Sequence, residues 1–378
     1  MNIAITSRSK IEDIKYWSGT IKNIYNALKL NKNIKIIKID NLNNSIRKIH
    51  ALKREVIKFT KNEKYDDAYN ETVSKNFSNQ IQNKINKINK IDCILCFDAS
   101  LVSYLKTDIP IILWTDLLYS HYYDHYYKNK KIVKNSLNSI NKIEISTIKK
   151  AKKILLPTKW ALAKAKNKYI KYSRKFYLLP FGPNFKTKIK KKNVKKIISK
   201  RSKNCLYLLT LSVDWERKGI EKLIKLKEII KKKNINIKLL IIGLKKKTLL
   251  KDKDIKIIPF IDKTNINGEK KISNYLVRSH FHILFSTAEA YGISLIEANS
   301  RAVPNISFKV GGISNVIKKN INGKLFKKDE GLDVIADYII RIYQNKKKYY
   351  KLAKSSYDYY YKNFEYSKII NNFVKLIK

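Results

Sequence analysis

The sequence predicts an α/β protein with two doubly wound domains, and three observations support this prediction. At 378 residues the chain is long enough for two domains that each bury a core. Short apolar runs, typical of buried strands, alternate with segments of helical spacing, and this alternation favours parallel sheets. A lysine-dense stretch with few large apolar residues, 186–203, separates two such series and indicates a solvated linker.

The first series begins with a strand, a loop and an amphipathic helix at 21–30. A polar segment rich in Lys and Asn, 42–90, is expected to be helical. A second well-marked helix is expected at 140–153, and another starts at Thr158. The strands expected in this half are 2–6, 33–40, 91–97, 109–114, 154–157 and 176–180.

The second series has the same alternation. A helix that starts at Ile220 has its apolar positions on one face, and a further helix is expected at 293–302. Helices rich in Tyr and Lys end the chain. The strands expected in this half are 205–211, 239–243, 255–260 and 281–285.

The segment 286–315 is the part of the sequence best suited to chemistry. It holds Glu289 in a strand-to-helix turn and Glu297 about one turn into the following helix. Free N–H groups at a helix start attract an anion, and Gly292 lets the backbone approach it closely. By spacing alone, however, an exposed helical Glu beside an unrelated loop Glu is the more common arrangement.

Composition limits the alternatives. The formal charge of +52 raises nucleic acid as a partner, but the lysines are spread through the chain and accompany Ile, Asn and Tyr, as in a general compositional bias. Cys93 and Cys96 lie in an apolar run expected to be a buried strand, and with Cys205 they form no disulfide framework. The His spacing fits no zinc site. Without a membrane-length apolar run or a leader pattern, we expect a soluble, intracellular protein.

The order Glu, aromatic, Gly, helix with Glu-Ala, then Arg-Ala-Val-Pro and Gly-Gly resembles the donor-sugar signature of retaining nucleotide-sugar glycosyltransferases of family 4. The resemblance covers nearly the whole chain and is weakest at 42–90. It implies the GT-B fold, with two Rossmann-like domains and a cleft between them. The expected parts are an acceptor domain at 1–184, a linker at 185–203, a donor domain at 204–355 and a C-terminal helix at 356–378 that packs back on the first domain.

On the donor side, the resemblance gives roles to charged residues. Lys218 matches the Lys of a Lys-Gly pair that reaches the donor diphosphate. Relatives add an Arg six residues earlier, where this chain has Ser212, so Arg217 is the candidate for the second charge. Glu289 is expected to position the sugar and stabilise positive charge at the anomeric carbon, and Glu297 to bind the ribose.

Further donor contacts follow from the same resemblance. The backbone amides of Tyr291, Gly292 and Ile293 are expected at the diphosphate, and the loop with Phe260 and Ile261 at the nucleobase. Since the family works with protein cations, neither a metal ion nor a cofactor is expected.

The acceptor side is less clearly marked. The run W-S-G-T after the first strand resembles the family's first loop, which lies near the acceptor. Relatives place a His directly after the fourth strand, where this chain has Thr-Asp; a His in the aromatic cluster 118–127 is the candidate replacement, although packing is the commoner role for such tyrosines. The residues expected on the acceptor side are Trp17, Ser18, Gly19, Thr20, Asp116 and His121.

The resemblance implies a cytoplasmic enzyme that moves a sugar from a nucleoside-diphosphate sugar to a glycan or lipid-linked acceptor with retention. No nucleic-acid partner is expected. The lysine charge adds the hypothesis of weak association with an anionic inner membrane face. Two alternatives stay open: a nucleotide-sugar epimerase of the same fold, and a basic nucleic-acid-binding protein that uses the charge and not the carboxylates.

Overall fold

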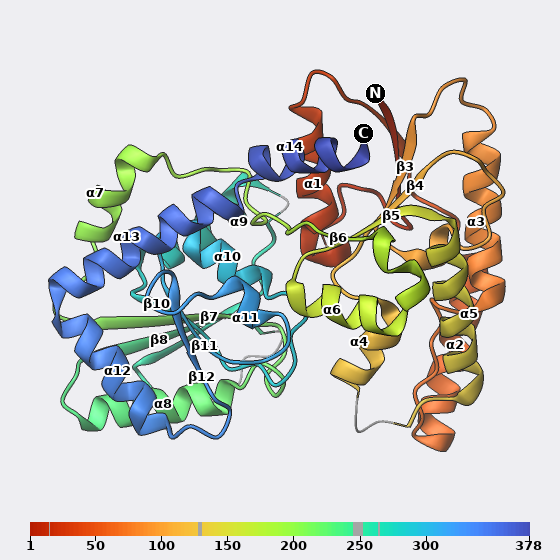
Figure 1. Ribbon diagram of the computed structural model, residues 1–378. Coiled ribbons are helices and arrows are strands. Elements are labelled where there is room, and N and C mark those ends of the chain that lie inside the picture. The colour runs from red at the N-terminus through yellow and green to blue at the C-terminus, as the bar shows by residue number, and fades with distance from the viewer. Residues whose placement is uncertain (15, 128–130, 245–251, 264) are drawn as a thin grey trace. The chain divides into compact units, whose positions relative to one another are not determined.

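The chain folds into two compact units, seen in a computed structural model that describes residues 1–14, 16–127, 131–244, 252–263 and 265–378. Unit 1 comprises Met1–Pro180 and Ile369–Lys378, and unit 2 comprises Phe181–Lys368. Each unit contains one six-stranded sheet with helices packed against it (Figure 1). All the strand pairs are parallel, which confirms the predicted α/β class.

In unit 1 the first strand has neighbours on both sides, because the chain adds β2 on one side of β1 and β3 on the other. Ile3 is opposite both Ile36 and Cys93 in the register. The central strands are buried on both faces, as parallel strands usually are, and the predicted burial of Cys93 and Cys96 is confirmed. The sheet order is β2 (Lys35–Ile39), β1 (Asn2–Thr6), β3 (Cys93–Cys96), β4 (Ile111–Trp114), β5 (Ala151–Leu156) and β6 (Phe176–Leu178).

The helices of unit 1 differ from the prediction in several places; α4 was not predicted, and α5 begins at Lys134 and not at residue 140. The polar stretch 42–90 is two helices, because the segment between them, 62–70, turns inward and buries Asp66 and Asp67. The helix predicted to reach Lys153 ends at Lys150, and the next strand begins at once. The helices are α1 (Thr20–Lys29), α2 (Ser45–Lys61), α3 (Glu71–Ile85), α4 (Tyr119–Tyr126), α5 (Lys134–Lys150) and α6 (Lys159–Lys168), with 3-10 turns η1 (Tyr16–Gly19), η2 (Ala99–Leu101) and η3 (Ile170–Lys175).

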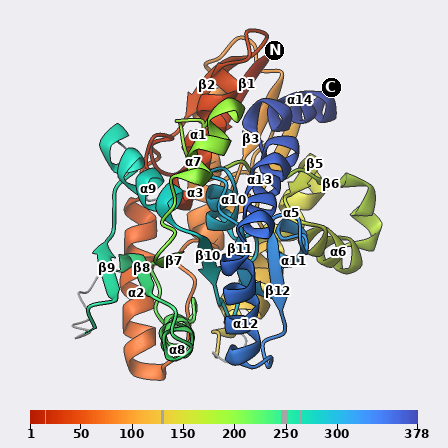
Figure 2. The ribbon, with the colours of Figure 1, turned by 90° about the vertical axis from the view of Figure 1, so that its left-hand side faces the viewer.

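The sheet of unit 2 is also built outward from its first strand. The chain adds β8 and β9 on one side of β7, then crosses over and adds β10, β11 and β12 on the other (Figure 2). Four of these strands were predicted from the sequence, and β11 and β12 were not. The sheet order is β12 (Gly323–Phe326), β11 (Asn305–Phe308), β10 (Phe281–Leu284), β7 (Leu206–Leu211), β8 (Ile237–Leu244) and β9 (Ile255–Pro259).

The segment predicted as a linker, 185–203, lies within unit 2. It contains two short helical pieces, and Val194 and Ile198 are buried despite the surrounding lysines. The last helix, α14, contributes Phe373 to unit 1, where its ring stacks on Trp114. The helices from here on are η4 (Lys191–Asn193), α7 (Val194–Ser199), α8 (Ile220–Lys232), α9 (Ile266–Arg278), α10 (Ile293–Asn299), α11 (Ile313–Val316), α12 (Leu332–Gln344), α13 (Lys346–Asn363) and α14 (Tyr366–Ile377).

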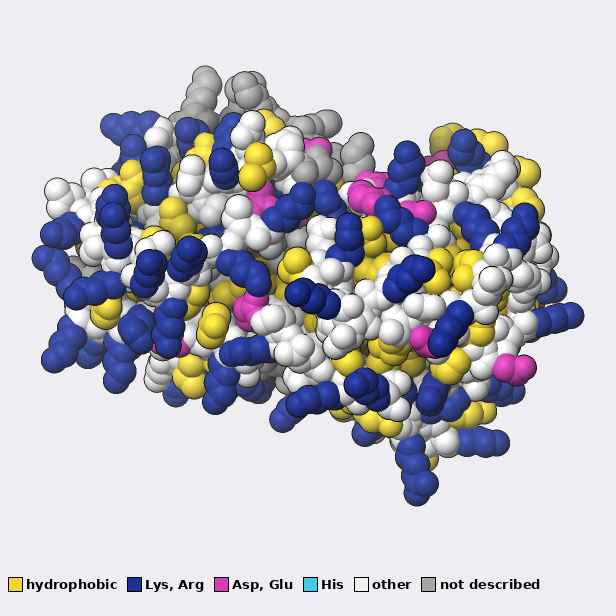
Figure 3. Space-filling view, turned by 90° about the horizontal axis from the view of Figure 1, so that it is seen from above, with side chains coloured by type: hydrophobic (Ala, Val, Ile, Leu, Met, Phe, Trp, Pro, Cys, Tyr) yellow, Lys and Arg dark blue, Asp and Glu magenta, His cyan; other side chains and the backbone are white. Residues whose placement is uncertain are grey.

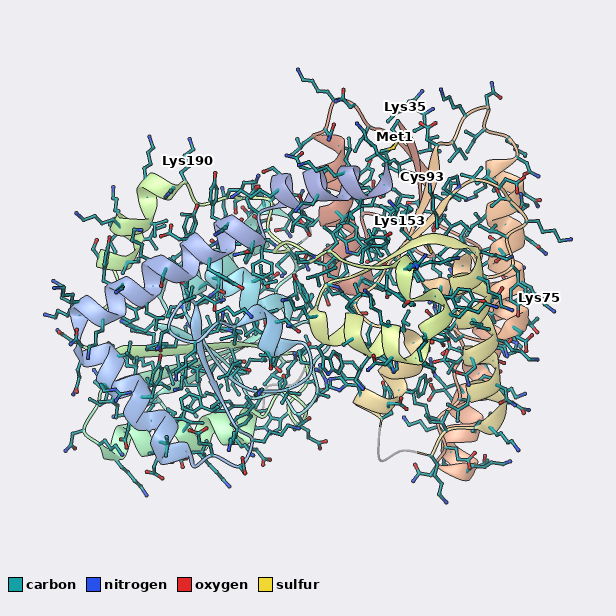
Figure 4. The ribbon with its side chains drawn as sticks, viewed as in Figure 1. Met1, Lys35, Lys75, Cys93, Lys153 and Lys190 are labelled. Carbon is teal, nitrogen blue, oxygen red and sulfur yellow. The ribbon has the colours of Figure 1, made fainter. Side chains whose placement is uncertain are left out.

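Basic side chains are spread over the surface. Figure 3 shows Lys and Arg scattered across the face in view, with far fewer acidic side chains among them. Lys75 and Lys190, on different elements, both project outward (Figure 4). This distribution agrees with the prediction that the charge is not confined to one arm or helix.

Candidate functional site

The crossover in the sheet of unit 2 opens a place for a ligand. Strands are added in opposite directions from β7 and β10, so the loops after these two neighbours run apart at their carboxyl ends, where ligands of doubly wound sheets bind. Lys218 lies in the loop after β7, and Glu289 lies in the loop after β10. The predicted cation and carboxylate therefore belong to the two loops that border this place.

Lys218 and Glu289 form an ion pair. The Lys218 Nζ donates to Glu289 Oε2 at 2.5 Å, and each side chain is 12% exposed. The Arg217 Nη1 lies 3.4 Å from the same oxygen, and the Ser286 hydroxyl donates to it at 3.3 Å. Burial alone would raise the pKa of the Glu289 carboxyl, but the charge of Lys218, its hydrogen bond and the charge of Arg217 hold that pKa below its ordinary value. The carboxylate is therefore ionised.

Two glycines make this geometry possible. Gly219 has φ +66°, and a Cβ there would lie 2.5 Å from the Phe285 carbonyl oxygen, so a side chain at this position would push the two loops apart. Gly292 has φ +80°, and its Cβ would lie 2.8 Å from the Leu295 Cδ1. The close approach of the two loops thus requires the glycine of the Lys-Gly pair, whereas the left-handed backbone at the start of α10 favours glycine at position 292.

Glu297 is the second buried carboxylate. It lies on α10 with a side chain that is 2% exposed, and the Lys263 Nζ donates to its Oε1 at 2.5 Å. Lys263 belongs to the loop predicted to hold the nucleobase, where Phe260 is 52% exposed and Ile261 packs on the core. Lys263 therefore joins the two predicted donor elements. Its loop was predicted to hold the nucleobase, but Lys263 itself was given no role there.

Other residues of the signature support the site by packing. The Tyr291 hydroxyl donates to the Phe181 carbonyl oxygen at 2.5 Å, and burial raises the pKa of that phenol. Arg301 is buried, donates to the Thr187 carbonyl oxygen at 2.8 Å and covers the Phe185 ring at 4.1 Å. The side chains of Tyr291 and Arg301 are therefore occupied within unit 2.

Arg217, the candidate second cation, is held between the two loops. Its Nε donates to Asp214 Oδ2 at 3.1 Å, and its Nη1 donates to the Ala288 carbonyl oxygen at 3.3 Å. The contact with Glu289 brings it into the same cluster as Lys218. The structure thus groups Arg217 with the predicted catalytic pair.

In unit 1, the predicted W-S-G-T run forms a strained turn before α1. Trp17 and Ser18 have φ of +54° and +52°, values that residues other than glycine adopt rarely, and Gly19 has φ +81°. Thr20 is the first residue of α1. The Trp17 ring lies 6.2 Å from the ring of Phe97, directly after β3, so the turn is at the carboxyl ends of the strands.

The other two acceptor-side candidates occupy different surroundings. Asp116 follows the carboxyl end of β4. His121 is buried on α4, with its Nε2 3.1 Å from the Lys164 carbonyl oxygen of α6 and its Nδ1 4.0 Å from Asp124. Burial lowers the pKa of His121, which favours the neutral ring. These contacts tie His121 to its own helix and to α6.

Unit 1 contains a buried ion pair that was not predicted from the sequence. Arg8, after β1, pairs with Asp98, after β3, at the place that corresponds to Lys218 and Glu289 in unit 2. The Tyr16 hydroxyl donates to Asp98 at 3.1 Å, and the Arg8 guanidinium lies 5.8 Å from the centre of that tyrosine ring. Asp98 directly follows the predicted strand 91–97, and this position could have marked it as a candidate in the sequence.

The described residues were also compared with the requirements of a metal site and of a membrane-spanning helix. They contain no group of three or more His, Cys, Asp or Glu placed to hold a metal ion. Within the same residues, no helix combines the length and apolar character needed to span a membrane.

The comparisons with known proteins agree with this geometry. Residues 190–359 match the family described as glycosyl transferases group 1. No curated protein matches the chain. Among solved structures, sucrose-phosphate synthase from Thermosynechococcus elongatus has a TM-score of 0.71 at 13% identity, over 100% of this chain and 98% of its own.

Two more solved structures are similar in fold. WaaG, a glycosyltransferase involved in lipopolysaccharide biosynthesis, has a TM-score of 0.65 at 12% identity, over 100% of this chain and 99% of its own. TarM has a TM-score of 0.56 at 15% identity; the match covers 79% of this chain and 58% of TarM. At these identities the likeness is one of fold, the GT-B fold of glycosyltransferases.

Proposed function

Because residues 190–359 match the group 1 glycosyltransferases and the chain has the GT-B fold, we propose that it transfers a sugar from a nucleoside-diphosphate sugar to an acceptor hydroxyl with retention of anomeric configuration. One observation carries the proposal: a lysine and a carboxylate meet at the crossover of the sheet in unit 2. The lysine would face the leaving group, and the carboxylate would face the sugar.

Lys218 suits the leaving group. A departing nucleoside diphosphate gains negative charge, and fixed cations aimed at that charge lower the barrier. In the chain alone, the Lys218 ammonium is bound to Glu289. Its flexible four-carbon stem lets it share its three N–H donors between this carboxylate and a phosphate oxygen. Arg217, in contact with the same carboxylate, would add to the positive field.

Glu289 suits the sugar. Breaking the bond to the diphosphate leaves positive charge on the anomeric carbon, and an ionised carboxylate nearby stabilises that charge. The lowered pKa of Glu289 keeps it ionised at neutral pH. A hydrogen bond from a sugar hydroxyl to the same carboxylate would orient the ring.

Glu297 and Lys263 suit the nucleoside. A buried carboxylate is a strong acceptor for ribose hydroxyls, and Glu297 already accepts from Lys263. The half-exposed ring of Phe260 in the same loop could cover a nucleobase. A crystal structure of a TarM mutant contains UDP, so UDP-sugars are the first donors to try.

The acceptor proposed is a glycan or lipid-linked glycan of the cell surface. WaaG acts in lipopolysaccharide biosynthesis, which supports a pathway of this kind. The charge of +52, spread over the surface, supports weak association with an anionic membrane, to which each nearby Lys or Arg adds about 1 kcal/mol. We propose a cytoplasmic enzyme that works at the inner membrane face.

The test begins with a thermal-shift panel of UDP-, GDP- and ADP-sugars, because a ligand of the native state raises its stability. The sugar that binds is then incubated with acceptor lipids extracted from a membrane fraction. NMR of the product should show the anomeric configuration of the donor. Inversion would overturn the retaining assignment, and conversion of the donor sugar to its epimer without acceptor would favour the epimerase alternative.

A further inference from the structure

Helix α2 of unit 1 turns its apolar side chains toward solvent. Ile49, Leu52, Val56 and Phe59 are 65, 70, 60 and 91% exposed. Their spacing of three, four and three residues aligns them in one stripe along the helix. All of α2 lies among the described residues, and it contains no buried side chain. The stripe therefore contributes nothing to the core of unit 1.

The face that α2 turns inward is largely polar, with Ile46 and Ile57 half-buried on it. The Arg47 Nε and the Arg54 Nη1 lie 2.9 and 2.8 Å from the carboxylate of Asp67. The His50 Nδ1 lies 2.6 Å from the Tyr65 hydroxyl. Figures 1 and 2 show α2 at the periphery of unit 1, and α3 is a helix that it contacts. Charged and polar contacts therefore do much of the work of attaching the helix, and its most exposed apolar side chains face away from them.

Charge decides what the stripe can meet. Between Ser45 and Lys61 there are six Lys and Arg and one Glu, a net charge of +5. By helical geometry, Lys48 and Lys53 flank the stripe on its two sides. A second copy of the chain would bring the same positive charge against this face. An anionic lipid surface offers phosphates to the lysines and acyl chains to the apolar residues.

We propose that α2 is the membrane-docking element of this chain. The stripe of Ile49, Leu52, Val56 and Phe59 would enter the boundary between headgroups and acyl chains, while Lys48 and Lys53 bind the anionic headgroups. This inference rests on the proposed action at a membrane and names the surface responsible. It also explains why the apolar residues of α2 are left outside the fold.

The experiment uses the full chain and sedimentation with vesicles of phosphatidylglycerol and phosphatidylcholine, or of phosphatidylcholine alone. Binding is expected to the anionic vesicles only. The double variant Leu52→Ser/Phe59→Ser should bind the anionic vesicles at least about tenfold more weakly, because two inserted apolar side chains are lost. The matched control is Leu30→Ser, at a residue that is 80% exposed elsewhere on unit 1, and it should bind as the wild type does.

A second readout reports insertion directly. With Phe59→Trp, anionic vesicles should shift the tryptophan emission to the blue relative to the wild-type chain. Unchanged emission together with unchanged sedimentation of the double variant would overturn the proposal. So would a wild-type dimer that the double variant turns into a monomer, since the stripe would then be a self-association surface. Donor-induced thermal shifts should be the same in all these variants, so loss of docking is distinguishable from loss of the proposed transferase function.

Discussion

The two units place an ion pair at the same point of similar sheets and hold it differently. In unit 1 the Arg8 guanidinium lies 5.8 Å from the ring centre of Tyr16 and 5.9 Å from that of Phe77, so two aromatic rings confine it. Its partner Asp98 accepts from the Ser100 N–H at 3.0 Å and thereby caps η2. This pair is fixed on both sides by the fold.

In unit 2 the cation is a lysine on a loop, directly before a glycine. A lysine stem rotates more freely than a guanidinium between rings, so Lys218 can redirect its ammonium when a phosphate arrives. The topology therefore offers a ligand position in both units. The side chain at that position, Arg8 or Lys218, decides whether the protein fills the position itself or keeps it for a substrate.

The largest effect is expected on stability in unit 1. Asp98→Asn leaves the buried Arg8 charge without its counter-charge, which typically lowers the free energy of unfolding by about 3–5 kcal/mol. Urea unfolding measures the change. The double variant Arg8→Met/Asp98→Asn removes the orphaned charge and should recover part of the loss. A cost below about 1 kcal/mol for Asp98→Asn would show that the unit 1 pair is no more structural than a surface pair.

The next largest effect is expected on turnover in unit 2. Glu289→Gln should lower kcat by about 10²–10³-fold, because the amide cannot balance positive charge in the transition state. The free energy of unfolding should change less than in Asp98→Asn, since the flexible Lys218 stem is not confined between two rings as the Arg8 guanidinium is. Ser286→Ala, which removes only a 3.3 Å hydrogen bond to the same carboxylate, is the matched control. A change confined to KM would contradict the assigned role.

Glu297 should act on nucleotide affinity. Glu297→Ala is expected to weaken nucleotide binding, measured by calorimetry, by about 1.5–3 kcal/mol, because hydrogen bonds to a charged acceptor are lost. Lys263→Met keeps the carboxylate and removes its present partner, so its effect should be smaller. Small and equal effects of Glu289→Gln and Glu297→Ala on both kcat and affinity would contradict the two separate roles.

The sequence predicted most of this architecture because parallel strands buried on both faces are continuous apolar runs. It missed β11, whose sequence, Asn305 to Phe308, alternates polar with apolar residues although all four are buried. The Asn305 Oδ1 lies 2.8 Å from the His282 Nδ1, and the Asn305 Nδ2 donates to the Leu295 carbonyl oxygen at 2.9 Å. A single sequence does not reveal such buried partners. The polar composition therefore concealed a core strand.

The candidate site was predicted as residue types and not as contacts. The spacing of Glu289 and Glu297 located both carboxylates, but the pairing of each with a lysine depends on where loops from separate strands meet. Helix α2 shows the opposite limit. Its apolar stripe has the ordinary helical period, and only the contacts of Arg47 and Arg54 with Asp67 reveal that the stripe faces outward.

A smaller effect is expected from acid pH, which should lower the free energy of unfolding through two buried histidines of unit 2. Burial, with the charge of Lys218, lowers the pKa of His282 to about 4, and burial, with Arg201, does the same for His280. Because the unfolded chain takes up these protons near pH 6.5, each His costs stability as pH falls from there toward 4, by about 1.4 kcal/mol per pH unit. Above pH 6.5 neither contributes to the pH dependence.

The measurement is urea unfolding at pH 7 and pH 5. His282→Asn should flatten the slope between these values, whereas Lys38→Gln, which breaks an exposed pair in unit 1, should leave it unchanged. Equal slopes in the wild type and His282→Asn would contradict the assignment of the acid sensitivity to this buried ring.

The smallest effect is expected from chelation, and it follows from the same comparison. Unit 2 keeps Lys218 and Arg217 at the crossover, so the charge of a departing diphosphate would meet protein cations directly. Turnover should therefore be unchanged by EDTA. Lys218→Ala should lower kcat, and added Mg²⁺ should not restore it. The substitution leaves Glu289 at the crossover, but that carboxylate is assigned to the sugar and not to a metal ion. If EDTA abolished turnover and Mg²⁺ or Mn²⁺ restored it, the diphosphate would depend on a metal ion, and the lysine in unit 2 would be as structural as the arginine in unit 1.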